Sequence, residues 1–470
     1  MIRNHSRHGS RFPITLGGGG ATDPYWPFVS MLLHGDGTNA AQNNTFLDGS
    51  TNNFTVTRNG NTTQGSFNPF VSTYPYAVAT NGGSGYFDGT GQSLSVPANV
   101  AFNLSTSDFT IEYWIYLTAS NAYINSQSDT GVTSLAWYQQ CAAGVITSVV
   151  RNSSNVDITC TSSAGAIVVN TWYHVAFVRN GNTTRQYING VQNGTGNVTG
   201  FTVRTSTGPI NVGNLYVGST GDVKGYISNF RLVNGTCLYP SGTTFTPPTA
   251  PLTAVTNTAL LLGMSNGAIF DNAELNNLET VGTAQISTSV FKYGTGAVSF
   301  DGTGDYLTSP DVTALNFGIA DFTVEMWVNP TSFGASGGFL YAKVDTTLSA
   351  ANNGWFAYVT STGEIKFGYG TASGSYFVLT TASVTTSSWQ HIALVRQGAV
   401  VTVYRNGVSI GTNTLADAAS HDKTTPLYIG RYYTSTGFDY NGYIDDLRIT
   451  KGVARYTATF TPPTAAFPNK

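Results

Sequence analysis

The sequence predicts an all-β protein made of two antiparallel β-sandwich domains in tandem, preceded by an extended N-terminal arm. Residues 87–91 read Phe-Asp-Gly-Thr-Gly, and the same five residues recur at 300–304, 213 residues further on. Apolar and polar residues alternate with a period of two through both copies, and Asn-Gly pairs separate several of these stretches. A repeat this long is a whole domain rather than a solenoid unit. The chain therefore contains two tandem copies of one domain fold.

Four further motifs recur in the same order in both copies. They are an Asp-Phe-Thr-x-Glu-x-Trp strand, a Trp-x-His strand that ends in Arg, an Asn-Gly hairpin and a closing Phe-Thr-Pro-Pro-Thr-Ala segment. They occupy residues 108–114, 172–179, 189–190 and 245–250 in the first copy, and 321–327, 389–396, 406–407 and 460–465 in the second. We interpret a feature present in both copies as architecture and a feature present in one copy as a candidate for function.

The strand at residues 109–114 carries bulky side chains on both of its faces, so we expect it to be covered on both sides. Asn180-Gly181, Asn189-Gly190 and Asn406-Gly407 predict type I′ hairpin turns, because Asn and Gly adopt positive φ readily. The only expected helical segments are short turns at residues 99–103 and 311–316. Many short strands joined by such turns predict antiparallel β-sandwiches.

The boundary between the copies is expected near residue 250, where Pro247, Pro248 and Pro251 favour extended backbone. This boundary predicts one sandwich over residues 25–250 and a second over residues 251–470.

Residues 1–24 have no counterpart before the second copy, and Gly17 to Gly20 mark a hinge within them. We expect these residues to form a basic arm whose Arg3, Arg7 and Arg11 dock on an acidic surface of a partner in the same particle. A solvated tail is the alternative.

The composition of the chain limits the classes of partner that the protein can bind. Charged residues make up 10% of the chain and the formal net charge is −3, so no broad basic surface exists to hold nucleic acid. The apolar runs are too short to cross a bilayer, which predicts no membrane insertion. The N-terminus also lacks the apolar stretch of a secretory signal, although the low charge and the many Gly, Asn and Thr residues are typical of proteins exposed outside cells. A virus particle released by lysis satisfies both observations.

All three cysteines, Cys141, Cys160 and Cys237, lie in the first copy. The fold that both copies share therefore cannot depend on disulfides. If residues 135–160 form a three-stranded meander, Cys141 and Cys160 lie two strands apart, roughly 10 Å, which is too far for a bridge. We expect three free thiols.

Taken in order, these motifs resemble the laminin-G-like, concanavalin-A-like jelly roll over nearly all of both copies. A final Gly-Tyr-Ile segment, at residues 225–227 and again at 442–444, strengthens the resemblance. The resemblance implies the fold of each domain. It leaves the function open among lectins, adhesion modules, glycosidases and phage structural proteins. The composition and the tandem copies look most similar to bacteriophage virion proteins that carry such modules on tail fibres or capsids.

Catalysis is not expected. A retaining glycosidase needs two carboxylates about 5 to 5.5 Å apart, and neither copy has the Glu-x-Asp-x-x-Glu strand that supplies them in this kind of fold. Glu112 is the only Glu in the first 250 residues, and Glu325 has no second acid beside it. We interpret both, together with His174 and His391, as hydrogen-bonded structural residues.

Calcium is the one cofactor that the sequence leaves open, and only for the second domain. Asp301 and Asp305 lie close enough in Asp-Gly-Thr-Gly-Asp to share a hard cation with backbone carbonyls. In the first copy Gln92 replaces the second acid. A tight turn built on Asp88 or Asp301 explains the shared residues without a metal.

Aromatic residues divide into shared and single-copy sets. Trp114, Trp137 and Trp172 correspond to Trp327, Trp355 and Trp389, so we expect all six to be buried. The loop before Gly442 is longer than its counterpart before Gly225. It carries Tyr432, Tyr433, Phe438 and Tyr440, which we expect to form an exposed cluster that stacks on a sugar or packs against a protein partner.

The sequence therefore predicts a non-enzymatic bacteriophage virion surface protein, present in several copies per particle or as a homo-oligomer. Its predicted partners are other virion proteins and a host-surface glycan. A secreted or cell-surface carbohydrate-binding adhesin is the first alternative, and a glycan-active hydrolase is the second.

Overall fold

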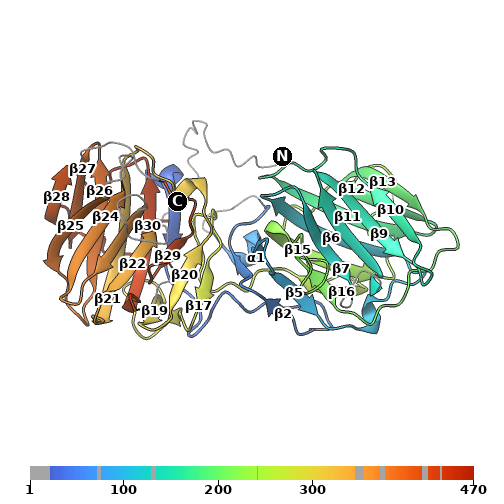
Figure 1. The fold of residues 1–470 in the computed structure, drawn as a ribbon, viewed down its shortest axis with the longest axis horizontal. Coiled ribbons are helices and arrows are strands. Elements are labelled where there is room, and N and C mark those ends of the chain that lie inside the picture. Colours follow the sequence, from blue (N-terminus) through green and yellow to red (C-terminus); the bar gives the residue numbers. More distant parts are fainter. Residues whose placement is uncertain are drawn as a thin grey trace.

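A computed structural model describes residues 22–70, 76–128, 134–240, 242–344, 354–370, 376–414, 422–433 and 437–469. The described residues form two β-sandwiches that lie side by side along the long axis of the molecule (Figure 1). Each sandwich contains one eight-stranded and one seven-stranded sheet, and the strand pairs within these sheets are antiparallel. The predicted fold class is confirmed. No helix among these residues is long and apolar enough to cross a membrane.

The first sandwich pairs a sheet of order β13-β12-β11-β6-β15-β4-β3, in which β16 also pairs with β15, with a sheet of order β10-β9-β8-β7-β14-β5-β2. Its strands are β2 Thr57–Asn59, β3 Thr63–Gly65, β4 Ser84–Asp88, β5 Ser93–Val96, β6 Phe109–Leu117, β7 Ala122–Gln127, β8 Trp137–Ala142, β9 Val145–Arg151, β10 Asp157–Thr161, β11 Trp172–Asn180, β12 Thr183–Ile188, β13 Val191–Asn197, β14 Ile210–Val212, β15 Lys224–Asn234 and β16 Thr258–Leu262.

The second sandwich repeats this arrangement as β18-β19-β30-β21-β26-β27-β28, in which β1 also pairs with β30, and β17-β20-β29-β22-β23-β24-β25. Its strands are β1 Val29–Leu33, β17 Glu279–Val281, β18 Gln285–Ser287, β19 Ala297–Asp301, β20 Tyr306–Ser309, β21 Phe322–Ser332, β22 Gly338–Lys343, β23 Trp355–Val359, β24 Glu364–Gly370, β25 Tyr376–Ser383, β26 Gln390–Gln397, β27 Val400–Arg405, β28 Val408–Thr414, β29 Leu427–Ile429 and β30 Asn441–Lys451.

Most of the predicted helical turns and hairpin turns are confirmed. The 3-10 helices Val100–Phe102 and Thr313–Leu315 lie inside the two predicted helical turns. Asn189 and Asn406 have positive φ and are each followed by a glycine with positive φ, as a type I′ turn requires. The type I′ prediction is wrong at residues 180–181. Asn180 ends β11 in extended pairing with Thr183, and only Gly181 has positive φ.

The opening strand of each sequence copy belongs to the sandwich of the other copy. Strand β1 pairs with β30, with Leu32 opposite Arg448, and β16 pairs with β15, with Leu261 opposite Arg231. All five residues of each exchanged strand are buried. The first sandwich is therefore one continuous segment, residues 46–265, inserted between β1 and the rest of the second sandwich. The division predicted near residue 250 is wrong for these two strands.

Two aspartates hold the exchanged strands in place. Asp271 Oδ1 accepts a hydrogen bond from Leu32 N at 2.9 Å, and Asp48 Oδ1 accepts one from Leu261 N at 3.0 Å. Both aspartates are buried, and burial raises the pKa of Asp271 to about 6. The same contact in both sandwiches shows that each exchanged strand occupies an equivalent position.

Asn43 fixes the point at which the chain crosses between the sandwiches. Its side chain is fully buried. The amide donates to Ile269 O and Leu278 O, each at 2.8 Å, while Oδ1 accepts from the N–H groups of Ala268 and Ile269. All four hydrogen-bonding positions of the amide are used. Nearby, the fully buried Asn277 of the second sandwich donates to Ser84 O of the first at 2.8 Å. The junction is thus specified by buried polar contacts.

The tryptophans occupy two different environments. Trp137 and Trp355 lie between the sheets of their sandwiches. Trp114 and Trp327 are buried on the outer side of the eight-stranded sheets, because the residues beside them in sequence face the core. Trp172 lies in the same outer cluster as Trp114 and is also buried. The expectation of burial is wrong only for Trp389, which is partly exposed.

The cysteines behave as predicted. Cys141 lies on β8 and Cys160 on β10, and β9 runs between them. All three thiols are free, and burial raises the pKa of Cys160 to about 11.

Candidate functional site

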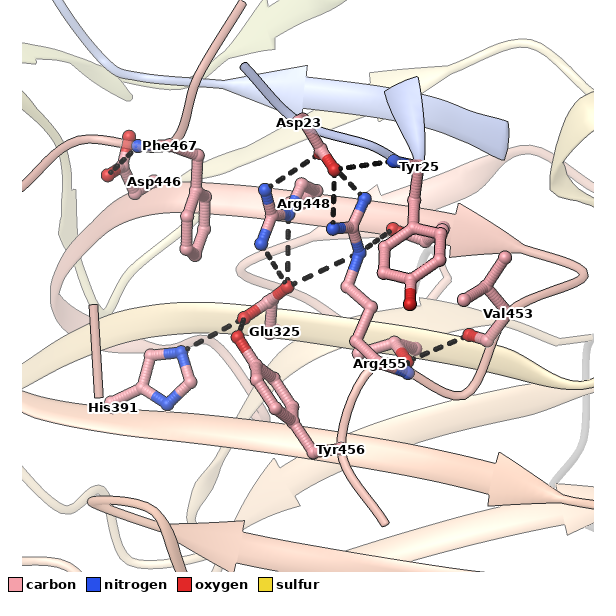
Figure 2. A network of polar contacts seen from close by, with 12 residues as sticks. Asp23, Tyr25, Glu325, His391, Asp446, Arg448, Val453, Arg455, Tyr456 and Phe467 are labelled. Carbon is pink, nitrogen blue, oxygen red and sulfur yellow. Dashed lines mark hydrogen bonds and ion pairs between the residues drawn. The ribbon is translucent and has the colours of Figure 1, made fainter. Parts of the chain in front are cut away.

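A buried carboxylate network joins the strands on the outer side of the second sandwich's eight-stranded sheet (Figure 2). Glu325 of β21 is fully buried. Its Oε1 accepts two hydrogen bonds from Arg448, from Nε at 3.0 Å and Nη2 at 2.7 Å. Its Oε2 accepts the hydroxyl of Tyr456 at 2.7 Å and lies 3.2 Å from Nε2 of His391. Both carboxylate oxygens are therefore occupied by protein groups.

Asp23 extends this network toward the N-terminus. Its Oδ2 accepts from Nη1 of Arg448 at 3.0 Å and from Nη2 of Arg455 at 2.8 Å, and its Oδ1 accepts from Nη1 of Arg455 at 2.9 Å. Asp23 is buried, so it is part of the second sandwich. The arm boundary predicted after residue 24 is wrong at this position. Arg3, Arg7 and Arg11 lie outside the described residues.

The first sandwich repeats the core of the network without Asp23. Glu112 accepts from Arg231 Nε at 2.9 Å and from Tyr239 OH at 2.7 Å, and lies 3.1 Å from His174 Nε2. Burial by itself raises the pKa of both glutamates. The charges and hydrogen bonds of the neighbours together outweigh burial, led by the Arg448 charge for Glu325 and by the His174 hydrogen bond for Glu112, so both net pKa values are lowered. The expectation that Glu112 and Glu325 are hydrogen-bonded is confirmed, with His174 and His391 each lying beside one of the carboxylates.

The proposed calcium turn is held by hydrogen bonds. Asp305 is buried, its Oδ2 accepts from Asp301 N at 3.0 Å and its Oδ1 accepts from Thr283 N at 2.6 Å. In the first copy, Gln92 Oε1 accepts from Asp88 N at 2.9 Å. A neutral amide thus makes the same contact as the Asp305 carboxylate, so the turn itself requires no cation.

Calcium takes about six to eight oxygen ligands, which include carboxylates, backbone carbonyls and waters. Among the described residues, no group of three or more His, Cys, Asp and Glu side chains is placed to hold a metal ion. Calcium binding by Asp301 and Asp305 stays a prediction.

The predicted aromatic loop is only partly exposed. Tyr440 lies in the core against Phe300, with ring centroids 6.1 Å apart. Its N–H donates to Gly430 O, as Val223 N donates to Gly213 O in the first copy, so Tyr440 occupies a position common to both copies. Tyr432 is also buried, at 6% exposure. The expectation of an exposed cluster is therefore wrong for Tyr432 and Tyr440.

Tyr433 and Phe438 are partly exposed, and they belong to a larger surface that we call the aromatic face. This surface is the outer side of the seven-stranded sheet of the second sandwich. Phe339 and Phe356 point outward because their neighbours Leu340 and Trp355 point into the core. The aromatic face comprises Tyr306, Phe339, Phe356, Tyr358, Tyr428, Tyr432, Tyr433 and Phe438.

The rings of the aromatic face are packed in a fixed arrangement. Phe339 stacks on Tyr358 and on Tyr432, with centroids 5.0 and 5.1 Å apart, and the edge of Phe438 covers it at 6.1 Å. Tyr306, Tyr358, Tyr433 and Phe438 remain partly exposed. They present ring surface to solvent above buried Phe339 and Phe356, so the face is preorganised for an apolar or stacking contact.

Two cations border the aromatic face. The guanidinium of Arg431 lies 4.7 Å from the centroid of the Tyr306 ring, and a bidentate ion pair with Asp439 holds it there. Lys366 Nζ lies 5.9 Å from the Tyr358 ring. Burial raises the pKa of Tyr428 to about 12, so its hydroxyl is neutral at physiological pH. Arg431 is buried and Lys366 is partly exposed, so Lys366 offers the border of the face a donor for polar groups.

The corresponding surface of the first sandwich is much less aromatic. Asn211, between core residues Ile210 and Val212, replaces Tyr428, and Ser93, before core residue Leu94, replaces Tyr306. The first sandwich keeps rings only at the positions of Phe339 and Phe356, as Tyr123 and Tyr138, so the remaining rings of the aromatic face are the single-copy part. Sequence reasoning missed most of the aromatic face because it searched one loop. The outward aromatic positions of β22, β23 and β29 alternate with core residues and are visible once the strands are known.

Comparison with protein-family models identifies the family of the two sandwiches. A family model described as the Concanavalin A-like lectin/glucanases superfamily matches residues 88–238 and again residues 301–455, together more than half of the chain. The chain belongs to this superfamily. Each sandwich is thus a concanavalin A-like domain, and the resemblance to tandem laminin-G-like domains is confirmed at the level of the family. Comparison with curated protein sequences found no match.

The search of solved structures found matches at low identity and low TM-score. Domains LG4-5 of the mouse laminin alpha1 chain are 14% identical, cover 85% of this chain and 97% of their own, and have a TM-score of 0.29. The binding domain of Paraclostridial Mosquitocidal Protein 1 is 15% identical over 39% of this chain, with a TM-score of 0.34, and the match spans only 47% of that structure. Domain 4 of a Geobacillus stearothermophilus arabinanase, solved with arabinotriose, is 20% identical over 37% of this chain and 77% of its own, with a TM-score of 0.27.

Proposed function

We propose that this protein is a non-enzymatic surface protein of a bacteriophage virion whose second sandwich adheres to a host-surface glycan through the aromatic face. The observation that carries the adhesion proposal is that the second sandwich extends this face with Tyr306, Tyr358 and Tyr428, where the first sandwich has Ser93, Gln140 and Asn211. Architecture shared by the two sandwiches does not explain it. Membership of a lectin-containing superfamily supports a binding role, and the structural use of Glu112 and Glu325 supports a role without catalysis.

The chemistry of the aromatic face suits a sugar polymer. Exposed ring faces pack against the C–H surface of a pyranose, and the partly exposed Lys366 at the border can donate hydrogen bonds to its hydroxyl groups. The packed layer beneath keeps the rings in place before binding, which lowers the entropy cost of binding.

Truncating the exposed rings tests the adhesion proposal. Tyr358→Ala and Phe438→Ala should each weaken binding to immobilised bacterial polysaccharides by about tenfold, since a stacking contact is worth about 0.5–1.5 kcal/mol beyond the area that it buries. Tyr138→Ala, at the position of the first sandwich that corresponds to Phe356, is the matched control and should bind normally. A glycan array with purified variants measures this. Equal binding by all three variants and the wild type would remove the aromatic face from the proposal.

The virion proposal rests on the N-terminal residues. Deletion of residues 2–20 removes Arg3, Arg7 and Arg11 but keeps Asp23, so the melting temperature should not change while incorporation into particles is lost. Deletion of residues 2–24 is the contrasting variant. It also removes Asp23 from Arg448 and Arg455 and should lower the melting temperature. Mass spectrometry of purified particles measures incorporation, and normal incorporation of the first deletion would show that the arm does not anchor the protein.

A secreted carbohydrate-binding adhesin is the second candidate, because the same aromatic face would serve it equally well. The two candidates differ in where the protein is found. Recovery of the protein with purified virions favours the first, and recovery from a cell surface or culture medium without particles favours the second.

A further inference from the structure

A pocket of about 380 Å³ opens at the junction between the two sandwiches, away from the aromatic face. Four separate segments build it: the residues after β1, the start of the short helix α1 (Val78–Asn81), the crossing segment of the second sandwich and the C-terminal residues. Its lining residues are His34, Gly35, Asp36, Gly37, Tyr76, Val78, Phe270, Asn272 and Asn469. Because both sandwiches contribute lining residues, the pocket is formed only where the two sandwiches meet.

The back wall of the pocket is held by His34. Its Nδ1 contacts Asp446 Oδ1 and its Nε2 lies 2.6 Å from Asn469 Oδ1, so both ring nitrogens face oxygen acceptors. Burial lowers the pKa of His34, but the hydrogen bonds and charges of its neighbours, led by Asp446, together outweigh burial and the net pKa is raised. In the first sandwich Gly263 follows the exchanged strand in place of His34, so this wall is a single-copy feature.

An aromatic wall faces this polar one. The rings of Tyr76, from the first sandwich, and Phe270, from the second, lie 5.3 Å apart with an interplanar angle of 56°. Both are partly exposed. The Tyr76 hydroxyl donates to Gly82 O at 2.6 Å, which fixes the orientation of the ring. The pocket therefore has a preformed surface for stacking.

Unused polar groups complete the lining. Asn272 donates its backbone N–H to Leu32 O at 2.7 Å, but within the described part of the chain its side-chain amide has no hydrogen bond. Asp36 is exposed, and its Oδ1 accepts the hydroxyl of Thr295 at 3.0 Å while Oδ2 stays open in the same described residues. The pocket thus offers both donors and acceptors beside an aromatic wall.

We propose that this junction pocket binds a single neutral pyranose ring. Its volume lies in the range of small-molecule sites, about 300 to 1,000 Å³, and its lining combines aromatic surface with a few polar groups, as such sites require. The open oxygen of the Asp36 carboxylate can accept a hydrogen bond from a sugar hydroxyl group, and its negative charge repels an anionic sugar. The site is independent of the aromatic face, so the proposal stands apart from the function proposed above.

Binding of monosaccharides to the full chain tests this proposal. Glucose, galactose, mannose and N-acetylglucosamine are titrated by ligand-observed NMR, with glucuronate as the anionic comparison. We expect at least one neutral sugar to bind, and to bind at least tenfold more tightly than glucuronate. Asn272→Leu removes the amide at similar size, and Phe270→Leu removes the ring. Each should weaken binding at least tenfold. Asp36→Asn should reduce the difference in affinity between the neutral sugar and glucuronate.

The control is Tyr138→Ala on the first sandwich, which lies in neither site and should leave monosaccharide binding unchanged. Tyr358→Ala measures separately what the aromatic face contributes to the signal. Melting temperatures of all variants establish that they are folded, and Asn272→Leu serves as the decisive variant if Phe270→Leu is unstable. Absence of binding by every neutral sugar would overturn the pocket proposal, as would full binding by folded Asn272→Leu. Loss of binding in Tyr358→Ala alone would overturn it too, while supporting the aromatic face as the sugar site.

Discussion

Residues 46–265 expressed alone should fold cooperatively, whereas residues 25–250, the first repeat that the sequence delimits, should not. The fragment 46–265 begins after β1, and β1 is not needed there because its partner β30 is absent from both fragments. The fragment 46–265 also extends far enough to include β16, which the fragment 25–250 lacks. Strand β16 pairs with β15 and places Leu260 and Leu262 in the core. Loss of a buried leucine costs about 2–5 kcal/mol, and a whole domain is stable by only about 5–15 kcal/mol.

Circular dichroism melts of the two fragments measure this difference. We expect a single sharp transition for residues 46–265 and a broad transition or aggregation for residues 25–250. If both fragments melted cooperatively at the same temperature, β16 would contribute nothing and the exchange would be incidental to the fold.

The second sandwich allows the reciprocal experiment. Residues 266–470 lack β1, so Met31 and Leu33 are missing from their core. A peptide of residues 22–45 added in trans should restore a cooperative transition by strand addition to β30. The same peptide with Leu32→Asp and Leu33→Asp is the control and should fail, because its carboxylates would have to be buried.

Glu325→Ala should destabilise the second sandwich by about 3–5 kcal/mol, because it leaves the buried charge of Arg448 without its main partner. Glu112→Ala should show a comparable loss in the first sandwich, where Arg231 is the partner. Asp157→Ala is the matched control. It removes an ion pair with Arg151 whose side chains are 17% and 30% exposed, and should cost less than about 1 kcal/mol.

Urea unfolding of the three variants measures these losses. The net pKa of Glu325 is lowered in the folded state, so its stabilisation is present above the ordinary Glu pKa and is lost as the pH falls. The cost of Glu325→Ala should therefore shrink at acidic pH. A loss below 1 kcal/mol at pH 7 would mean that the network is not important for stability.

The two candidate sites differ in how far the sequence could reveal them. The comparison of copies pointed to single-copy aromatics and included Tyr433 and Phe438, which are partly exposed. It could not separate them from Tyr440, because the alignment of a loop with an insertion does not say which tyrosine takes the core position of Val223. The junction pocket had no sequence signal, since Tyr76, Phe270 and Asn469 are distant in the chain and become neighbours only at the interface.

The sequence by itself determined the features that depend on local chemistry and periodicity. Alternating strands, the Asn-Gly turns at residues 189–190 and 406–407, the turn on Asp301 and the absence of disulfides were all readable, because each requires particular residue types at fixed spacing.

Only the tertiary structure decided which sandwich receives each opening strand. Strands β1 and β16 are both short, apolar and leucine-rich, and each lies opposite an arginine-bearing strand, so their local patterns fit either site. The choice depends on contacts made where the chain crosses, above all those of the buried Asn43. Such contacts join residues more than 200 positions apart, and no periodicity in the sequence encodes them.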